Sequence, residues 1–489
     1  MGTGTEGKPP VAPPTSARLS WPGLAVVLTA TAAVAIDIFI VFVAAPTIAA
    51  DLGASSSEIQ WVVAAYNLAF ALFLITGGRL GDLWGRKRVL MLGLFVFGLS
   101  SAACGAAPDP ITLIVARAVQ GVGAAMMLPQ VFSIIQVEFT PEHRGKPLAI
   151  VGVVQGIAAV GGQLLGGLLI GLDLFGLEWR TVFLINLPLC ALGLLFIPRL
   201  VPESRSPAAQ RLDLGGVGLA LLAVSALTVP LVQGQSAGWP AWTFVAFALT
   251  VPLAFAFVAW ERRVRDRGGS PLVELGLFGI PTFRVGVLLS LVFYLANPGV
   301  ILLLMIYLQE GLGLSPVEAG LVYTPAAIGF AAAALLVGRM GIARREHVLI
   351  PGIAVTALGV ITSALIPTVV DHPNAILLSL LFGLIGVGHG IVIPALNGTV
   401  LAETGPAHAG SASGLLITSQ QLGGALGVAL TGTIFFGHLG DTVGAAAYGD
   451  ALAVAFAAAL AALVLATGLA WRLFAIVHRS GALSAAAEA

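Results

Sequence analysis

The chain has 489 residues, of which 58% are hydrophobic and only 9% are charged, and its mean hydropathy is +1.00. Soluble domains carry about 25% charged residues, so this composition indicates a multi-pass membrane protein. The formal net charge is zero, which leaves no global field to attract nucleic acid. Cys104 and Cys190 lie within apolar runs, so we expect neither a disulfide nor a metal site.

A membrane-spanning helix needs about 20 apolar residues, and the chain offers fourteen such runs. The tail before them, residues 1–20, is rich in Pro, Gly, Ser and Thr, and we expect a disordered cytoplasmic segment rather than a signal peptide. The predicted spans are 22–50, 59–77, 89–107, 111–137, 147–172, 182–200, 214–233, 241–260, 283–309, 319–337, 348–369, 375–400, 409–436 and 451–474.

The seventh and eighth spans come from one uncharged stretch, 214–260, which is too long for a single crossing. Its middle reads GQSAGWPAW, and tryptophans of this kind favour the membrane interface, so we interpret it as a turn between two helices. With both termini cytoplasmic, the cytoplasmic segments then collect every Lys and Arg except Arg117 and Arg180. Such an excess is typical of cytoplasmic loops, and the pattern predicts a cell-membrane protein of this orientation.

Three motifs recur in the same order roughly 260 residues apart, which predicts two related halves. The basic hairpin GRLGDLWGRKRVL at 78–90 returns in degenerate form at 338–349. The other two repeats pair Gly121, Gly123 and Pro129 with Gly386, Gly388 and Pro394, and pair Gly152, Gly156, Gln163 and Gly166 with Gly410, Gly414, Gln421 and Gly424.

The repeat distance exceeds half the chain length, so we interpret 214–260 as an insertion between two six-helix halves. The predicted fold class is all-α integral membrane: two six-helix bundles plus two inserted transmembrane helices. Parallel halves with the site between them are a transporter architecture. The predicted divisions are 1–20 (tail), 21–205 (N-terminal bundle), 206–267 (inserted helices), 268–476 (C-terminal bundle) and 477–489 (cytoplasmic tail).

Two charged residues fall inside predicted spans. Asp37 is the only carboxylate deep in the first span, where an acid costs roughly 2.5–3.5 kcal/mol, and such residues tend to be functional. We expect Asp37 to alternate between a proton and a cationic substrate; the alternative is a purely structural ion pair. Arg117 is the only cation inside a span, beside Gln120, and either modulates proton coupling or braces backbone carbonyls.

Other polar positions are weaker candidates. Asn297, Pro298 and Gly299 interrupt the ninth span, which predicts either a cavity-lining break or a simple kink. On this helix Tyr294, Tyr307 and Gln309 are candidate substrate contacts. His389, in the twelfth span, could titrate, but we interpret it as a structural histidine.

Glycines mark two further regions. On the fifth span Gly152, Gly156, Gln163 and Gly166 share one stripe, which allows either a sliding contact between halves or static packing. In the basic hairpin, Asp82 could latch one conformation closed on the cytoplasmic side, whereas plain topogenic charge would explain only its cations. The hairpin set is Gly78, Gly81, Asp82, Gly85, Arg86, Lys87 and Arg88.

At these residues the chain resembles the major facilitator superfamily, and in particular its fourteen-helix branch of drug:proton antiporters. Stretch 78–88 matches the superfamily's loop signature, and Arg117, Gln120, Gly121 and Gly123 match the helix-four motif. Asp37 and Pro46 match a first-helix motif of the branch. Tyr66 and stretch 307–309 also match it, and the helix-five antiporter motif is occupied by Gly162, Gln163, Gly166 and Gly167.

The resemblance implies the major facilitator fold, with Arg117 linked to proton coupling and Asp37 to proton or cation handling. Two departures stand out: Gln163 replaces the motif's proline, and Phe39 and Phe42 replace the usual threonine and asparagine. The aromatic pair suggests an apolar or aromatic ligand. The cavity candidates are Phe39, Phe42, Tyr66, Gln120, Tyr294, Asn297, Tyr307, Gln309 and Gln421.

These observations predict a proton-coupled secondary exporter of hydrophobic, cationic or antibiotic-like compounds. It would be a monomer in the lipid bilayer, driven by the proton gradient without a cofactor or metal. The alternative within transport is an exporter or importer of an endogenous metabolite such as an amino acid or a siderophore. A membrane-embedded enzyme is the alternative from another class, but no cluster of His, Asp or Ser at a membrane face predicts catalytic residues.

Overall fold

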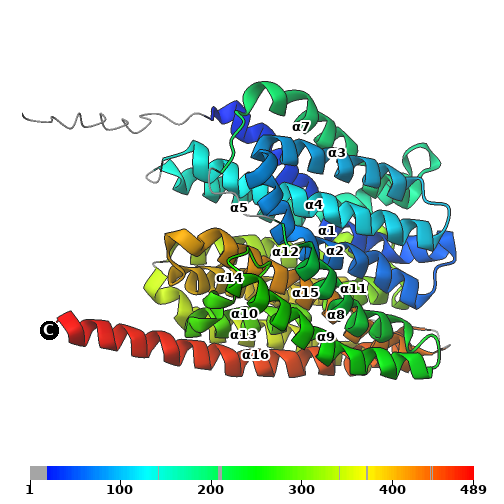
Figure 1. Ribbon diagram of the computed structural model, residues 1–489. Coiled ribbons are helices and arrows are strands. Elements are labelled where there is room, and N and C mark those ends of the chain that lie inside the picture. Colours follow the sequence, from blue (N-terminus) through cyan, green and yellow to red (C-terminus); the bar gives the residue numbers. More distant parts are fainter. Residues whose placement is uncertain are drawn as a thin grey trace, which may run out of the picture.

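A computed structural model describes residues 19–140, 143–206, 212–340, 342–370, 373–440, 442 and 444–488 (Figure 1). The predicted disordered tail therefore lies almost wholly outside the described residues. Within them, secondary structure is entirely helical, and fourteen helical stretches are long and apolar enough to cross a membrane. The predicted number of spans and the all-α fold class are confirmed.

The first half consists of six crossings. They are α1 (Trp21–Leu52), α2 (Ser56–Trp84), α3 (Arg86–Gly105), α4 (Pro110–Glu138), α5 (Gly145–Leu172) and the pair α6 (Thr181–Leu184) and α7 (Asn186–Leu200). Helices α2 and α3 pack against α4, while α5 and α7 pack against α1. The interior of the first half is therefore surrounded by α1, α3, α4 and α7.

The hairpin between α2 and α3 is tighter than the sequence predicted. Gly78, Gly81 and Asp82 lie in the last turns of α2, and only Gly85 forms the turn. Gly85 has φ +113°, in the region that favours glycine. Gly81 is helical, and its role is close packing. A Cβ there would lie against the side-chain amide of Gln130 on α4.

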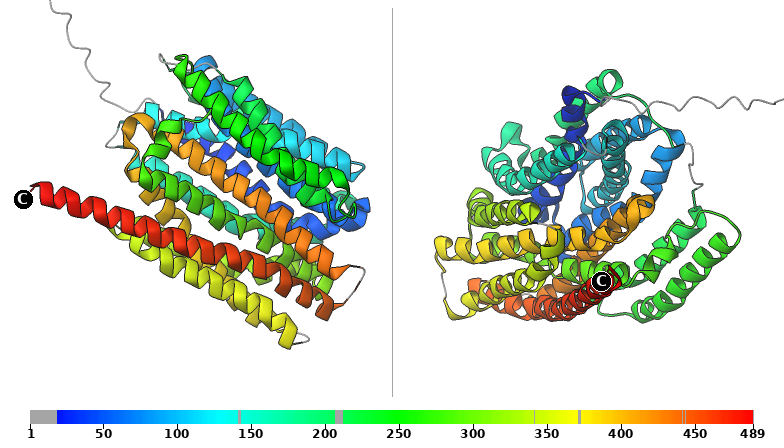
Figure 2. Two further views of the ribbon diagram at one scale, coloured as in Figure 1. Left: turned by 60° about the horizontal axis from the view of Figure 1, so that its bottom comes forward. Right: turned by 90° about the vertical axis from the view of Figure 1, so that its left-hand side faces the viewer.

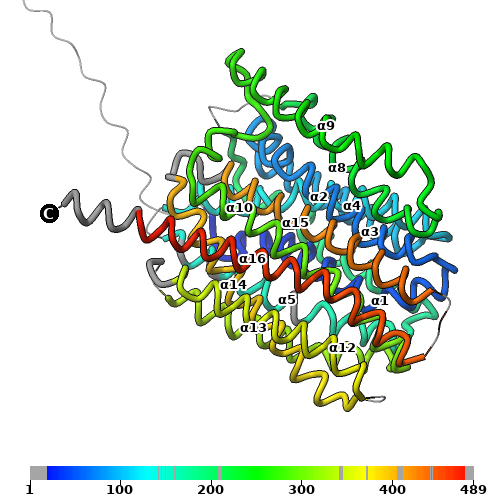
Figure 3. Tube along the Cα trace, turned by 90° about the horizontal axis from the view of Figure 1, so that it is seen from below, coloured from blue at the N-terminus to red at the C-terminus, as the bar shows by residue number. Residues whose placement is uncertain are grey.

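The inserted pair consists of α8 (Leu214–Gln233) and α9 (Ala241–Asp266). These helices pack on each other, and α8 also contacts α2 and α15 (Gly405–Leu439). The predicted turn between them uses positive φ at Gly238 and Trp239. Seen end-on in the right panel of Figure 2, the green pair lies beside the two main groups of helices, and Figure 3 shows α9 at the periphery.

The second half contains α10 (Pro281–Leu295), α11 (Pro298–Ile306), α12 (Pro316–Arg339), α13 (Ile342–Val369), α14 (Ala375–Ala402), α15 and α16 (Ala445–Glu488). Helices α10 and α11 form one crossing, broken at Asn297 as the sequence indicated, and it ends in a π turn, Tyr307–Gly311. The last helix, α16, extends through most of the predicted C-terminal tail and ends at Glu488.

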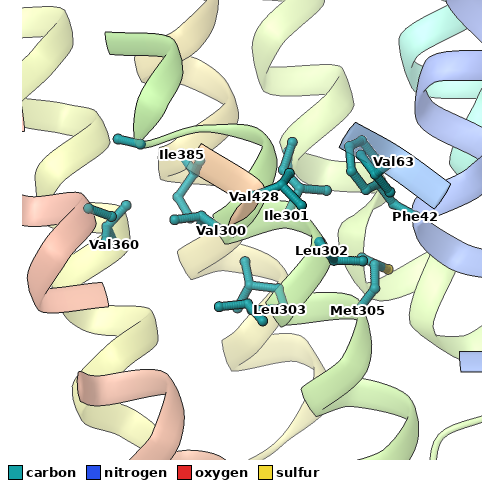
Figure 4. Packing of buried hydrophobic residues seen from close by; sticks show 14 of the residues in the cluster. Phe42, Val63, Val300, Ile301, Leu302, Leu303, Met305, Val360, Ile385 and Val428 are labelled. Carbon is teal, nitrogen blue, oxygen red and sulfur yellow. The ribbon is translucent and has the colours of Figure 1, made fainter. Parts of the chain in front are cut away.

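The two halves are in contact near one end of the molecule. Close packing joins the second half of α5 to the start of α12, where a Cβ at Gly167 would lie 2.5 Å from the Pro316 carbonyl. A hydrophobic cluster continues this seal, with Phe42 and Val63 facing Leu302 and Met305 in Figure 4.

The first half of α5 makes no such contact, since a Cβ at Gly152 or Gly156 would meet no atom within 4 Å. Around α5 the halves therefore meet where this helix ends and not where it begins. A second contact joins them along α2 and α15, where Thr418 donates to the Ala71 carbonyl.

Candidate transport cavity and buried charge network

Asp37 of α1 and Arg117 of α4 form an ion pair in the interior of the first half, where their side chains are 0% and 1% exposed. Nη1 of Arg117 donates to Asp37 Oδ2 at 2.5 Å and to Gln120 Oε1 at 2.6 Å. Its Nε donates to the Val62 carbonyl at 3.0 Å. The guanidinium also lies over the ring of Tyr66, 4.2 Å from its centroid.

Amide side chains complete the shell of Asp37. Its Oδ1 accepts from Gln120 Nε2 at 2.8 Å and from Asn186 Nδ2 at 2.9 Å. Ser101 ties these two amides together, accepting at 2.7 Å from Gln120 and at 3.2 Å from Asn186. Five crossings, α1, α2, α3, α4 and α7, thus supply one network, in which the sequence had singled out Asp37, Tyr66, Arg117 and Gln120.

The hydrogen bonds of this network match a carboxylate at Asp37 and a guanidinium at Arg117. Both oxygens of Asp37 face donors, and the guanidinium of Arg117 offers only donors. Breaking a buried pair by neutralising one member costs about 3–5 kcal/mol, because the other charge stays uncompensated. The ion pair therefore ties α1 to α4, and loss of either charge would leave the other buried without its counter-ion.

A cavity of about 340 Å³ lies between the halves, and it is lined by two walls of different character. The first half supplies four phenylalanines, Phe39, Phe42, Phe70 and Phe132, with Thr31, Asn67 and Gln155. The second half supplies Tyr294, Tyr323 and Phe330 together with the polar side chains of Asn297, His389, Asn397, Gln420 and Gln421.

The cavity carries no fixed charge: none of the described side chains that line it belongs to Asp, Glu, Lys or Arg. Asp37 is not among them, since its neighbours Ile38 and Phe39 face the cavity while Asp37 points into the first half. The geometry gives no support to direct contact between Asp37 and a cationic substrate.

The structure divides the predicted cavity residues. Phe39, Phe42, Tyr294, Asn297 and Gln421 line the cavity.

Four candidates do not line it. Tyr66 and Gln120 belong to the Arg117 network. Tyr307 is buried in the π turn, and Gln309 donates to the Val43 carbonyl at 3.0 Å, which ties α1 to the second half.

Sequence reasoning identified Asn297 and Gln421 on the polar wall but missed Asn397 of α14 and Gln420 of α15. Gln420 donates to Asn397 at 2.9 Å, and Asn297 Oδ1 is buried without a hydrogen-bond partner among the described residues. His389, which the sequence analysis assigned to structure, lines the same wall and packs edge-on against Phe293. The missed signal was amide side chains within apolar helices, Asn397 on α14 and Gln420 on α15.

In the basic hairpin, Asp82, Arg86 and Arg88 make their ion pairs within the first half. Asp82 pairs with Arg86 at 2.8 Å rather than with the second half. Glu203, just beyond α7, accepts from the Lys87 amide and lies 3.6 Å from Arg88. In this conformation the hairpin holds the segment that leaves the first half, and the latch predicted for Asp82 is not engaged.

The glycines of the antiporter motif lie in two helix–helix contacts of α5. Gly162 and Gly166 pack on α1, and Gly167 packs on α12. Gln163 is buried, and neither of its amide atoms has a hydrogen-bond partner among the described residues. A buried amide without hydrogen bonds is costly, so Gln163 lowers the stability of the observed arrangement.

The family model of the Major Facilitator Superfamily matches residues 27–428. The chain belongs to the major facilitator superfamily. It is thus a membrane transporter and not an enzyme.

Within the superfamily the chain is similar to antibiotic exporters and resistance proteins. It is 39% identical to a probable actinorhodin transporter of Streptomyces coelicolor, over 90% of this chain and 76% of that protein. It is 36% identical to the puromycin resistance protein pur8 of Streptomyces alboniger, over 92% and 90% of the two chains. It is also 36% identical to the cephamycin export protein CmcT of Amycolatopsis lactamdurans, over 84% of each.

Solved superfamily structures support the fold alone. An inward-facing, unoccupied bacterial homologue of the human lysosomal transporter Spinster aligns with a TM-score of 0.66 at 20% identity, covering 92% of this chain and 96% of that one. A proton-dependent oligopeptide transporter aligns with a TM-score of 0.68 at 14% identity, covering 94% and 100%.

Proposed function

We propose that this protein exports small aromatic compounds across the cell membrane in exchange for protons, by alternating access. The observation that carries the proposal is a charge-free, aromatic and amide-lined cavity between the halves, set beside a buried Asp37–Arg117 pair. The relatives named as antibiotic exporters support the direction and the kind of cargo. The proton gradient is the energy source, and no cofactor is required.

The cavity favours an uncharged substrate. A carboxylate would be needed to compensate a buried cation, and none lines the cavity among the described residues. The phenylalanine wall suits the face of an aromatic ring, while the amide wall suits carbonyl and hydroxyl groups at its edge. We therefore replace the cationic drug of the sequence-based prediction with a neutral aromatic compound that carries several hydrogen-bonding groups.

The proton step uses Asp37 as the carrier and Arg117 as its counter-ion. With Asp37 ionised, the pair holds α1, α4 and α7 together as observed. A proton entering from outside would neutralise Asp37 and release Arg117 from the ion pair. Arg117 would then keep only its other partners, Gln120 and the Val62 carbonyl. Because α1 and α4 both line the cavity, their shift would change substrate contacts without direct competition between proton and substrate.

The orientation follows from loop charge. With the basic hairpin in the cytoplasm, the closed end of the halves faces outside and the cavity faces inside, ready to load. Both termini are then cytoplasmic.

Everted membrane vesicles test the function and the substrate class together. Vesicles energised to an acid interior should accumulate a neutral polyhydroxylated anthraquinone, whereas tetraphenylphosphonium, an aromatic cation, should be transported at least tenfold more slowly. Equal transport of both probes would refute the uncharged substrate class, and no proton-dependent transport of either would refute export. Selective uptake of an amino acid or a siderophore instead would establish the metabolite alternative.

A further inference from the structure

A second pair of acidic side chains lies outside the transport cavity, where the inserted helices meet the rest of the molecule. Asp213 caps the N-terminus of α8, and Glu261 lies near the end of α9. Their side chains are 8% and 0% exposed. Neither belongs to the cavity or to the Asp37 network.

Asp213 is surrounded by donors. Its Oδ1 accepts from the Gly216 amide at 2.8 Å and from the Trp260 indole at 2.9 Å, and its Oδ2 accepts from the Leu272 amide at 3.3 Å. Burial raises the pKa of Asp213, but these hydrogen bonds outweigh burial and the pKa lies below its ordinary value. Asp213 is therefore the ionised member of the pair.

Glu261 is satisfied on one oxygen only. Its Oε2 accepts from the Val273 amide at 2.7 Å, whereas Oε1 is buried and no donor among the described residues reaches it. That oxygen faces Asp213: a Cβ on Gly216 would lie 2.5 Å from Glu261 Oε1 and 2.6 Å from Asp213 Oδ2. The two carboxyl groups are within hydrogen-bonding reach of each other, and such a bond needs a proton on one of them.

One cation stands close to the pair. Arg79, near the end of α2, donates to the carbonyls of Ser270 at 2.9 Å and of Pro271, and its charge acts on both acids. Glu274 is the other charged group near Arg79. The linker 270–273, which leads into the second half, is thus held through its carbonyls by the first half and through its amides by the acid pair.

We propose that Asp213 and Glu261 form a proton-binding site, in which one shared proton on Glu261 fastens the inserted helices to the linker entering the second half. The proton comes from water on the side of the basic hairpin and returns to it. Its loss places two carboxylates against each other, and their repulsion loosens Glu261 from the linker. This site does not depend on the proposed export activity.

Distance measurements between spin labels test the mechanical consequence. Labels on Trp84→Cys at the end of α2 and Arg263→Cys on α9, both exposed, report the separation of the inserted pair from the first half in the purified full chain in lipid nanodiscs. Raising the pH from about 6 to about 9 should lengthen and broaden this distance in the otherwise native chain. The matched control is Glu203→Gln, which removes a carboxylate at the same end and should keep the full response.

Both acids are required for repulsion, so Glu261→Gln and Asp213→Asn should each abolish the response to pH. Infrared difference spectroscopy gives a second readout: a protonated carboxyl band should vanish as the pH rises, be absent in Glu261→Gln and persist in Asp37→Asn. The proposal would be overturned if both acid variants kept a pH response of native size, or if the protein with both acids showed no response. It would also be overturned if no carboxyl band depended on Glu261. Failure of drug export would leave all these results unchanged.

Discussion

Asp37 and Arg117 constrain each other because neither side chain has access to water. The sequence identified both residues, since a charge within an apolar run is conspicuous. It could not show that they form one pair, because the 2.5 Å contact joins residues 80 positions apart. Nor could it reveal Ser101, which is a small polar residue of ordinary appearance until α3 brings it to the amides that bind Asp37.

Replacing Asp37 alone should damage both stability and transport. Asp37→Asn leaves Arg117 buried and unpaired, and we expect the free energy of unfolding to fall by about 3–5 kcal/mol, measured by unfolding in mixed detergent micelles. Asp37→Asn/Arg117→Met removes both charges and should recover most of that loss, yet remain inactive in proton-driven transport. A transport-competent double variant would show that the pair is only structural.

At the scale of helices, repeated glycines allow pairs of helices to approach closely. The sequence predicted that Gly121 and Gly386 occupy equivalent positions, and the structure packs Gly121 against α2 and Gly386 against α12. What the glycine pattern could not show is which stripes touch. Gly166 packs tightly against α1, whereas Gly152 and Gly156 on the same stripe have no neighbouring atom within 4 Å of an added Cβ.

Substitution of a contact glycine should therefore be costly. A Cβ at Gly386 would lie 1.7 Å from the Ala326 carbonyl, so Gly386→Ala must separate α12 from α14 and should lower stability by about 1–3 kcal/mol. Gly218→Ala on α8 is the matched control, because a Cβ there meets no atom within 4 Å. Thermal melting in detergent compares them, and equal melting temperatures would contradict the packing argument.

At the scale of the whole molecule, apolar runs predicted the fourteen spans, whereas the orientation inferred from charge stays a prediction. The arrangement of the halves was not predictable, because an apolar run indicates a span and not its neighbours. Asn397 and Gln420 of the polar wall were also missed, because the wall forms only when helices far apart in the sequence face one cavity.

Thiol labelling tests the orientation. Cysteine at Asn397, in the cavity, should react with an impermeant maleimide in everted vesicles and be protected in right-side-out vesicles. Cysteine at Ser236, exposed on the turn between α8 and α9, should show the opposite preference. The native Cys104 and Cys190 are buried and should stay unlabelled. Reversed preferences would invert the topology.

A cross-link tests movement of the halves. A Cβ on Gly171 would lie 3.9 Å from the Cβ of Val317, which is suitable for a disulfide between α5 and α12. Gly171→Cys/Val317→Cys should lose transport on oxidation, recover it with reductant, and still bind substrate from the open side. Undiminished transport by the fully cross-linked protein would exclude opening at this seam.

The most direct test of the central claim is proton flux in proteoliposomes that contain the purified protein. An outward gradient of a neutral aromatic substrate should drive protons in the opposite direction, detected by a trapped pH dye. Asp37→Asn should abolish this substrate-driven proton movement while substrate still binds. Proton movement of native size in Asp37→Asn would contradict the account.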